Sequence, residues 1–146
     1  MPEPDPMDVP NVLKCLNEAL VLQRRSVLQL TTASGSMFGL EVQGVANEMW
    51  AFAKEELDDL RRLVEKITAL GGDPGTDITE TKWSSDPRET VKSLIENETE
   101  TVDALHAVIP YSGQNSDSEA LEHLMEHIIM RKQNQVDWMQ RAIREP

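Results

Sequence analysis

Apolar residues recur every three or four positions over four long stretches of this 146-residue chain. This spacing places them on one face of a helix, because residues three and four apart lie on the same side. The stretches cover residues 12–32, 38–70, 86–109 and 116–143. No stretch alternates between apolar and polar residues for long enough to form a β-strand. The sequence therefore predicts an all-α protein with four long helices.

The segments between these stretches predict how the helices are connected. Residues 34–36 and residues 110–113 are expected to form short turns between neighbouring antiparallel helices. Residues 71–83 contain three glycines, one proline and three threonines without a helical period, which predicts a long extended connection. Asp86 followed by Pro87 predicts the start of the third helix, because aspartate caps a helix and proline is favoured at its first position. Two helix pairs joined by one long crossover are therefore expected.

The N-terminal residues 1–10 contain four prolines and three acidic residues, which predicts a flexible acidic lead-in. The remaining residues, 11–146, have the length of a single domain. The only cysteine, Cys15, can form no disulfide within the chain, and the N-terminus lacks a signal-peptide pattern. A cytoplasmic protein is therefore expected.

The chain carries 26 acidic and 14 basic residues and a formal net charge of −12. Such a charge repels nucleic-acid phosphates and anionic membranes unless basic residues gather on one face. The basic pairs Arg24-Arg25, Arg61-Arg62 and Arg131-Lys132 do not form such a face. No apolar run approaches the ~20 residues that span a bilayer. Neither a nucleic acid nor a membrane is therefore expected as a partner.

Several segments together resemble bacterioferritin and its relatives over residues 16–143. The resemblance is carried by Leu16-Asn17, by Glu56–Leu70 leading into Gly72-Asp73-Pro74, by Leu105–Ile109 and by Val136-Asp137-Trp138. The connectivity agrees, since ferritin-like bundles join two antiparallel helix pairs by a long crossover. The resemblance implies a ferritin-like four-helix bundle with the crossover between helices two and three. It also implies an inherited role in iron binding or iron storage and a homo-oligomer, either a dimer or a larger assembly.

Bundles of this kind hold two iron ions with carboxylates and imidazoles that project inward from all four helices. By the resemblance, the family's iron ligands on helices one to four fall in order on Gln23, on Glu56 with Asp59, on Glu98, and on Lys132 with Gln135. Only Glu56 and Glu98 match the family, and Asp59 is a further oxygen donor. Lys132 cannot bind a metal, because its ammonium group has no lone pair. The resemblance therefore implies a degenerate di-iron centre, and residual ferroxidase activity is not expected.

The six positions leave two functions open. In the first, the three acids retain an iron ion and with it an iron-handling role. In the second, Lys132 takes the place of the metals and neutralises the acids in a buried polar layer that includes the two glutamines. The protein would then be a metal-free structural or interaction protein. An alignment shifted by one helical turn would point Glu48 or Glu55 inward instead.

His123 and His127 form a second candidate metal site. Residues four apart lie on the same side of a helix, and histidine binds zinc, nickel and iron. The alternative is an ordinary solvated flank, because the inward face of this helix is defined by Leu121, Leu124 and Ile128.

The resemblance also implies expectations about haem and assembly. The methionine that holds haem between bacterioferritin subunits falls on Leu57, so no haem is expected. An antiparallel dimer along the first two helices is expected, with Trp50 and Met37 among the apolar residues that it buries.

Overall fold

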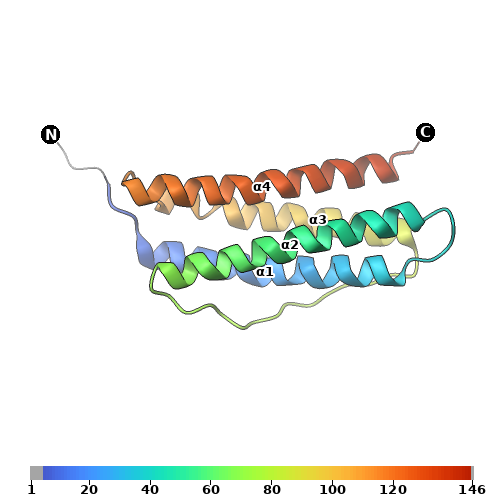
Figure 1. Ribbon diagram of the computed structural model, residues 1–146, viewed down its shortest axis with the longest axis horizontal. Coiled ribbons are helices and arrows are strands. Elements are labelled where there is room, and N and C mark those ends of the chain that lie inside the picture. Colours follow the sequence, from blue (N-terminus) through green and yellow to red (C-terminus); the bar gives the residue numbers. More distant parts are fainter. Residues whose placement is uncertain (1–4, 146) are drawn as a thin grey trace.

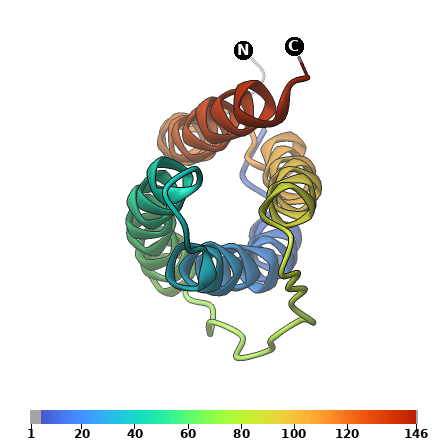
Figure 2. The same cartoon turned by 90° about the vertical axis from the view of Figure 1, so that its right-hand side faces the viewer.

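The computed structural model describes residues 5–145, which form four long α-helices and one short 3₁₀-helix (Figure 1). No strand occurs between residues 5 and 145, which confirms the all-α prediction. The four helices surround a common core, and the crossover lies outside them (Figure 2). Within this range no helix has a stretch apolar enough to cross a bilayer. The elements are α1 (Val9–Ser36), α2 (Gln43–Ala69), α3 (Pro87–His106), η1 (Ile109–Tyr111) and α4 (Ser116–Ile143).

Short polar side chains define where three of the helices begin. Asp8 accepts a hydrogen bond from a backbone N–H in the first turn of α1. Asp86 accepts one from the N–H of Arg88 (3.0 Å) at the start of α3. Asn115 and Ser118 form a reciprocal capping box at the start of α4. These bonds satisfy N–H groups that the first turn of a helix leaves without a partner. The predicted start of the third helix at Asp86 is confirmed.

The predicted turn at residues 34–36 is wrong, because α1 continues through this segment to Ser36. Its serine hydroxyls donate to carbonyl groups of the preceding turn, which is compatible with a helix. The chain turns instead at residues 37–42, where Gly39 has a φ of +105° that favours glycine. Phe38, expected on the face of the second helix, lies in this loop with 88% of its surface exposed.

The N-terminal boundary also differs from the one expected. α1 begins at Val9, inside the predicted lead-in, whose residues 1–4 lie outside the described residues. Asp5 and Asp8 form backbone hydrogen bonds of 2.8 and 2.9 Å with the connection between α3 and α4. That connection is longer than expected, because α3 ends at His106 and a separate 3₁₀-turn follows.

The connection between α2 and α3 is extended and follows the outer side of α1 (Figure 1), which confirms the predicted long crossover. Side chains of α1 fasten it. Asn17 Oδ1 accepts the N–H of Gly75 (2.7 Å), and Arg24 donates to the carbonyl of Asp77 (3.2 Å). The crossover is therefore attached to the bundle through its backbone, which explains why its own side chains show no helical period.

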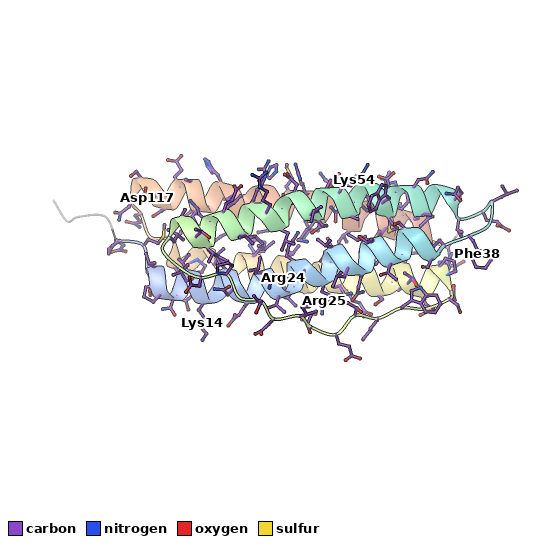
Figure 3. All side chains as sticks on the ribbon, turned by 60° about the horizontal axis from the view of Figure 1, so that its bottom comes forward. Lys14, Arg24, Arg25, Phe38, Lys54 and Asp117 are labelled. Carbon is purple, nitrogen blue, oxygen red and sulfur yellow. The ribbon has the colours of Figure 1, made fainter. Side chains whose placement is uncertain are left out.

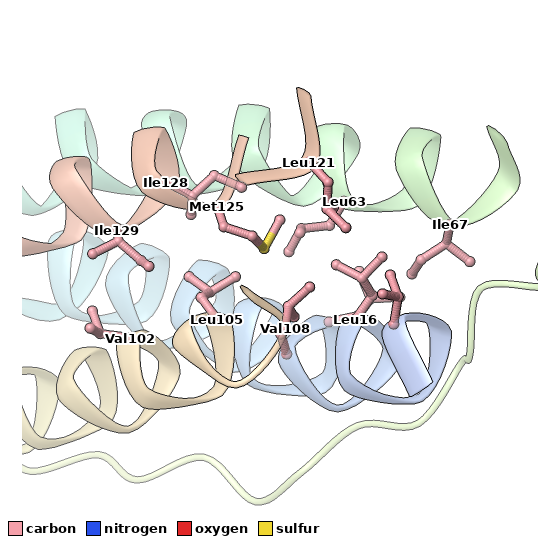
Figure 4. Close-up of a cluster of buried hydrophobic side chains, with 13 residues drawn as sticks. Leu16, Leu63, Ile67, Val102, Leu105, Val108, Leu121, Met125, Ile128 and Ile129 are labelled. Carbon is pink, nitrogen blue, oxygen red and sulfur yellow. The ribbon is translucent and has the colours of Figure 1, made fainter. Parts of the chain in front are cut away.

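Apolar side chains fill the interior as two separate clusters. The first, shown in Figure 4, lies in the half of the bundle where α4 begins, and the second lies in the half where α4 ends. Between them, every helix contributes buried polar residues. The first cluster consists of Val12, Leu16, Ala19, Leu20, Leu63, Ile67, Val102, Leu105, Val108, Leu121, Met125, Ile128 and Ile129. The second consists of Leu30, Ala33, Met49, Phe52, Ala53, Val91, Leu94 and Met139.

Candidate functional site

A layer of polar side chains crosses the bundle between the two apolar clusters. On α2 and α4 the polar residues come in pairs three positions apart, and this spacing directs both members to the same side of a helix. None of the surface of the residues in this layer is exposed to solvent. The layer consists of Gln23 from α1, Glu56 and Asp59 from α2, Glu98 from α3, and Lys132 and Gln135 from α4.

Lys132 lies between two carboxylates from different helices. Its Nζ donates to Oε2 of Glu56 and to Oε2 of Glu98, the latter at 3.4 Å. All three side chains are buried, and Lys132 is among the largest fully buried side chains of the chain. A buried charge persists only when it is paired and hydrogen-bonded. One ammonium group therefore compensates two acids and links α4 to α2 and α3.

Burial shifts the protonation equilibria of this group. Desolvation raises the pKa of Glu98 to about 7, and the nearby Glu56 charge adds to this effect. The positive charge of Lys132 and its hydrogen bond to Glu98 oppose the rise. Burial alone would lower the pKa of Lys132, but the Glu98 and Glu56 carboxylates outweigh burial and raise it above the ordinary value of 10.5. Near neutral pH Lys132 therefore stays charged, whereas Glu98 is protonated in part of the molecules.

The two glutamines contribute to the layer in different ways. Gln23 Nε2 donates to Oε2 of Glu56 (2.5 Å) and to its backbone carbonyl (2.9 Å), so it holds this carboxylate in place beside Lys132. Gln135 Nε2 donates instead to Oε2 of Glu55 (3.0 Å), on the side of the layer where α2 and α4 face each other. We call this side the α2–α4 wall. Gln135 is therefore tied to the wall of the layer rather than to its centre.

Asp59 is paired with an arginine that the sequence analysis did not assign to the site. Arg131 Nη1 lies 3.3 Å from Oδ1 of Asp59 and 3.3 Å from Oδ2 of Asp58, and it donates to the carbonyl of Glu55 (3.5 Å). Burial raises the pKa of Asp59 to about 6, with Arg131 opposing the rise. The sequence contains one signal that places Arg131 near the site: it lies four residues before Gln135 and therefore on the same side of α4.

The structure thus divides the six expected residues into two groups. Gln23, Glu56, Glu98 and Lys132 form one connected group, whereas Asp59 and Gln135 are held at the α2–α4 wall by Arg131 and Glu55. Neither Glu48 nor Glu55 takes the place of Glu56 at the centre. Glu56 is fully buried, whereas Glu48 and Glu55 are only half-buried.

The residues of the layer do not fit a di-iron centre. Across residues 5–145, no three Asp, Glu, His or Cys side chains come together closely enough to hold a metal ion. Lys132 separates the two glutamates that match the family's ligands, and an ammonium group repels a metal ion at that place. Five buried oxygens nevertheless accept no hydrogen bond from the described residues, namely Gln23 Oε1, Glu56 Oε1, Asp59 Oδ2, Glu98 Oε1 and Gln135 Oε1.

The histidines on α4 lie in different surroundings. His123 is exposed, with its Nε2 4.0 Å from Oε1 of Glu119. His127 is half-buried, and its pKa is lowered by burial and by the positive charges of Arg131 and Arg62. Two guanidinium groups beside His127 disfavour a metal cation there, and no third ligand joins the pair among the described residues.

The raised pKa values predict that the free energy of unfolding falls as pH rises from about 4.5 to 7. In this window the folded chain holds protons on Glu98 (about 7, against an ordinary 4.5) and Asp59 (about 6, against 3.8) that the unfolded chain has released. The folded state binds more protons, so raising the pH favours unfolding, and the slope flattens above pH 7. Glu98→Gln should reduce the slope, whereas Glu96→Gln on the exposed side of α3 should leave it unchanged. Melting temperatures at pH 5 to 8 test this, and equal slopes for all three proteins would contradict it.

Comparison with known proteins gives a consistent family. The model of the ferritin-like domain family matches residues 13–145. No curated protein sequence matches the chain. The chain is similar to a ferritin-like, diiron-carboxylate protein from Bacillus anthracis str. Ames, with a TM-score of 0.87, 23% identity, and coverage of 94% of this chain and 98% of that one.

Two further solved structures share the fold at a TM-score of 0.82 each, covering 92% of this chain and 84% of theirs. One is bacterioferritin from Rhodobacter capsulatus, described with a metal-free dinuclear site and a haem iron, at 18% identity. The other is the bacterioferritin-related protein from Bacteroides fragilis, a dodecameric thioferritin, at 17% identity. These identities establish likeness of fold alone, but the family model covers almost the whole chain. The protein belongs to the ferritin-like domain family.

Proposed function

We propose that this chain is a non-enzymatic ferritin-like protein in which a lysine–carboxylate layer takes the place of the two metal ions. Its function then depends on its surface, as a structural or interaction subunit of a homo-oligomer. One observation carries this proposal: the Lys132 ammonium donates to both Glu56 and Glu98 while all three side chains are buried.

An ammonium group and a metal ion exclude each other at this position. Both are cations that seek the same two carboxylates, and they repel each other strongly in a poorly solvated interior. Lys132 already supplies the positive charge that these acids require, and Gln23 donates a further hydrogen bond to Glu56. Lys132 therefore takes over the charge compensation that a metal ion would provide.

The test is the metal content of the intact protein. After expression with added iron and purification without chelators, we expect far less than one iron per chain by elemental analysis. We also expect the melting temperature to stay within about one degree when stoichiometric ferrous or zinc ions are added, because a ligand stabilises a protein only when it binds the folded state. One or two tightly bound iron ions per chain would overturn the proposal.

An iron-handling role is the second candidate, and the five unpaired oxygens of the layer favour it. Buried oxygens without hydrogen-bond donors are costly, and carboxylate and amide oxygens are suitable ligands for hard cations. Asp59 is the one acid of the layer that forms no ion pair with Lys132, because its partner is Arg131. The same metal analysis distinguishes this candidate, which requires a stoichiometric ion, from the first.

The homo-oligomer is proposed to form along α1 and α2. Leu28 on α1 and Trp50 and Leu57 on α2 are exposed by 45%, 49% and 56%. Trp50 and Leu57 are seven residues apart, which is two turns on one side of the helix. Their burial between two copies would remove an apolar patch from water.

The variant Trp50→Glu/Leu57→Glu is expected to abolish association along this face, because two buried carboxylates would lack partners. Light scattering should show a lower assembly mass than that of the parent. Met130→Glu, which changes an exposed apolar residue on α4, is the matched control and should keep the parent's mass. An unchanged mass for the double variant would rule out this face.

Two further expectations belong to the proposal. No haem is expected, because Leu57 has no side-chain atom that binds iron where the family resemblance places a methionine. A cytoplasmic location is expected, because the single cysteine, Cys15, cannot form a disulfide within the chain.

A further inference from the structure

The loop that joins α1 to α2, residues 37–42, exposes two large apolar side chains almost completely. Phe38 is 88% exposed and Leu40 is 98% exposed, the highest values for large apolar residues in the described range. Figure 3 labels Phe38 at the end of the bundle where this loop lies. The loop turns at Gly39, whose carbonyl accepts the N–H of Val42 (3.3 Å). We call residues 37–42 the end loop.

A cavity of about 310 Å³ opens at the same end, between the beginnings of α2 and α3 and the end of α4. Arg88 and Glu41 are among the polar residues that line it. Its apolar lining consists of Val42, Val45, Pro87, Val91, Ala142 and Ile143. We call it the end cavity. Leu40 does not fill the end cavity of its own chain, because almost all of its surface is exposed.

The end loop and the end cavity are neighbours, since Glu41 and Val42 belong to both. A two-fold axis beside the loop would therefore bring Leu40 of each copy to the end cavity of the other. A contact of this kind needs a projecting group and a matching recess on the same surface, and one chain supplies both. This self-complementarity indicates a second copy of the chain as the occupant.

The charges at this end also favour a second copy. The chain carries a net charge of −12, so two copies repel each other over most of their surfaces. The end cavity itself carries both signs of charge, since Arg88 lines it together with Glu41 and Asp86. Arg88 also lies 3.2 Å from Glu145, near the end of the chain. Arg141 and Arg144, near the end of α4, line a different pocket. A basic and two acidic groups around the same recess can pair with their counterparts across a two-fold contact.

We infer that this end of the bundle binds the same end of a second copy, with Leu40 entering the partner's end cavity and Phe38 packing beside it. The contact is separate from the α1–α2 face and does not depend on whether the layer holds a metal. A chain with both contacts forms an assembly larger than a dimer, because each copy then has two different neighbours.

The test compares assembly masses of full-length proteins by sedimentation velocity at equal concentration. Phe38→Ser/Leu40→Ser is expected to reduce the parent's mass at least twofold. Ile78→Ser, which removes an exposed apolar residue from the crossover, is the matched control and should keep the parent's mass. Ala142→Trp, which fills the end cavity from its rim, should reproduce the loss without changing the end loop.

A mass for Phe38→Ser/Leu40→Ser equal to the parent's would overturn the inference, because an end loop that serves another partner leaves self-assembly unchanged. An unchanged mass for Ala142→Trp would likewise remove the end cavity from the contact. Combination with Trp50→Glu/Leu57→Glu separates the two faces. If both faces form contacts, the combined variant has a lower assembly mass than either of the two double variants.

Discussion

Replacing Lys132 with glutamate is expected to lower the free energy of unfolding by about 3 to 5 kcal/mol in the absence of metal, the cost of breaking a buried ion pair. The change removes the cation that Glu56 and Glu98 share and adds a third carboxyl group beside them. The three groups are buried, so like-charge repulsion and desolvation act together. The new glutamate also occupies a position where the resemblance places a family ligand.

Ferrous or zinc ions should reverse much of this loss. Binding to the folded state alone adds roughly 2.7 kcal/mol when the metal exceeds its Kd a hundredfold. The measurement is the melting temperature of Lys132→Glu and of the parent with and without metal. Gln133→Glu places the same carboxylate on the exposed side of α4, with a charge change of one unit rather than two, and serves as the control. If the parent itself gained comparable stability from stoichiometric iron, Lys132 would not be blocking the site and the iron-handling candidate would prevail.

Removing Glu56 alone should cost more than removing the whole ion pair. In Glu56→Leu, Lys132 keeps only Glu98, at 3.4 Å, and Gln23 loses its carboxylate acceptor and keeps only the backbone carbonyl of residue 56. The loss is expected to be about 3 kcal/mol. In Glu56→Leu/Lys132→Leu the buried ammonium is gone and leucine fills the space. Replacement of a buried pair by apolar residues is often neutral or stabilising, so most of the loss should be recovered.

Urea denaturation of the parent, of Glu56→Leu, of Lys132→Leu and of the double variant gives the coupling energy between the two residues. The exposed pair Glu89 and Lys92, separated by 3.5 Å, provides the comparison. Its coupling should stay below about 1 kcal/mol, as is usual for exposed pairs. A double variant no more stable than Glu56→Leu would mean that the ion pair is not the main source of stability in the layer.

The helices and the long crossover could be predicted because their signals are local. Apolar period, the Asp86-Pro87 cap and the non-periodic segment 71–83 each depend on neighbouring residues alone. The turn at residues 34–36 was mispredicted, because glycine and serine suggest a turn although a helix tolerates them when packing supports it. Tertiary packing of α1 against α2 and α3 decided that boundary, and composition does not reveal such packing.

The centre of the site could be anticipated only in part. The inward positions of Glu56, Glu98 and Lys132 follow from helical spacing, but their partners depend on how the side chains are oriented. Gln135 lies on the inner face as expected, yet its amide donates to Glu55. The pairing of Asp59 with Arg131 joins residues 72 positions apart in the chain. Such a pairing depends on how α2 and α4 lie against each other, and no local pattern contains this information.

The polar layer between the two apolar clusters also fixes the axial register of the four helices. A helix that slides by one turn moves by about 5.4 Å, which leaves apolar contacts largely interchangeable. The same slip would carry the Lys132 ammonium into one of the apolar clusters, away from Glu56 and Glu98. Unpaired burial of that charge is far more costly than a repacked leucine. The layer therefore selects one alignment among several that the apolar residues alone would accept.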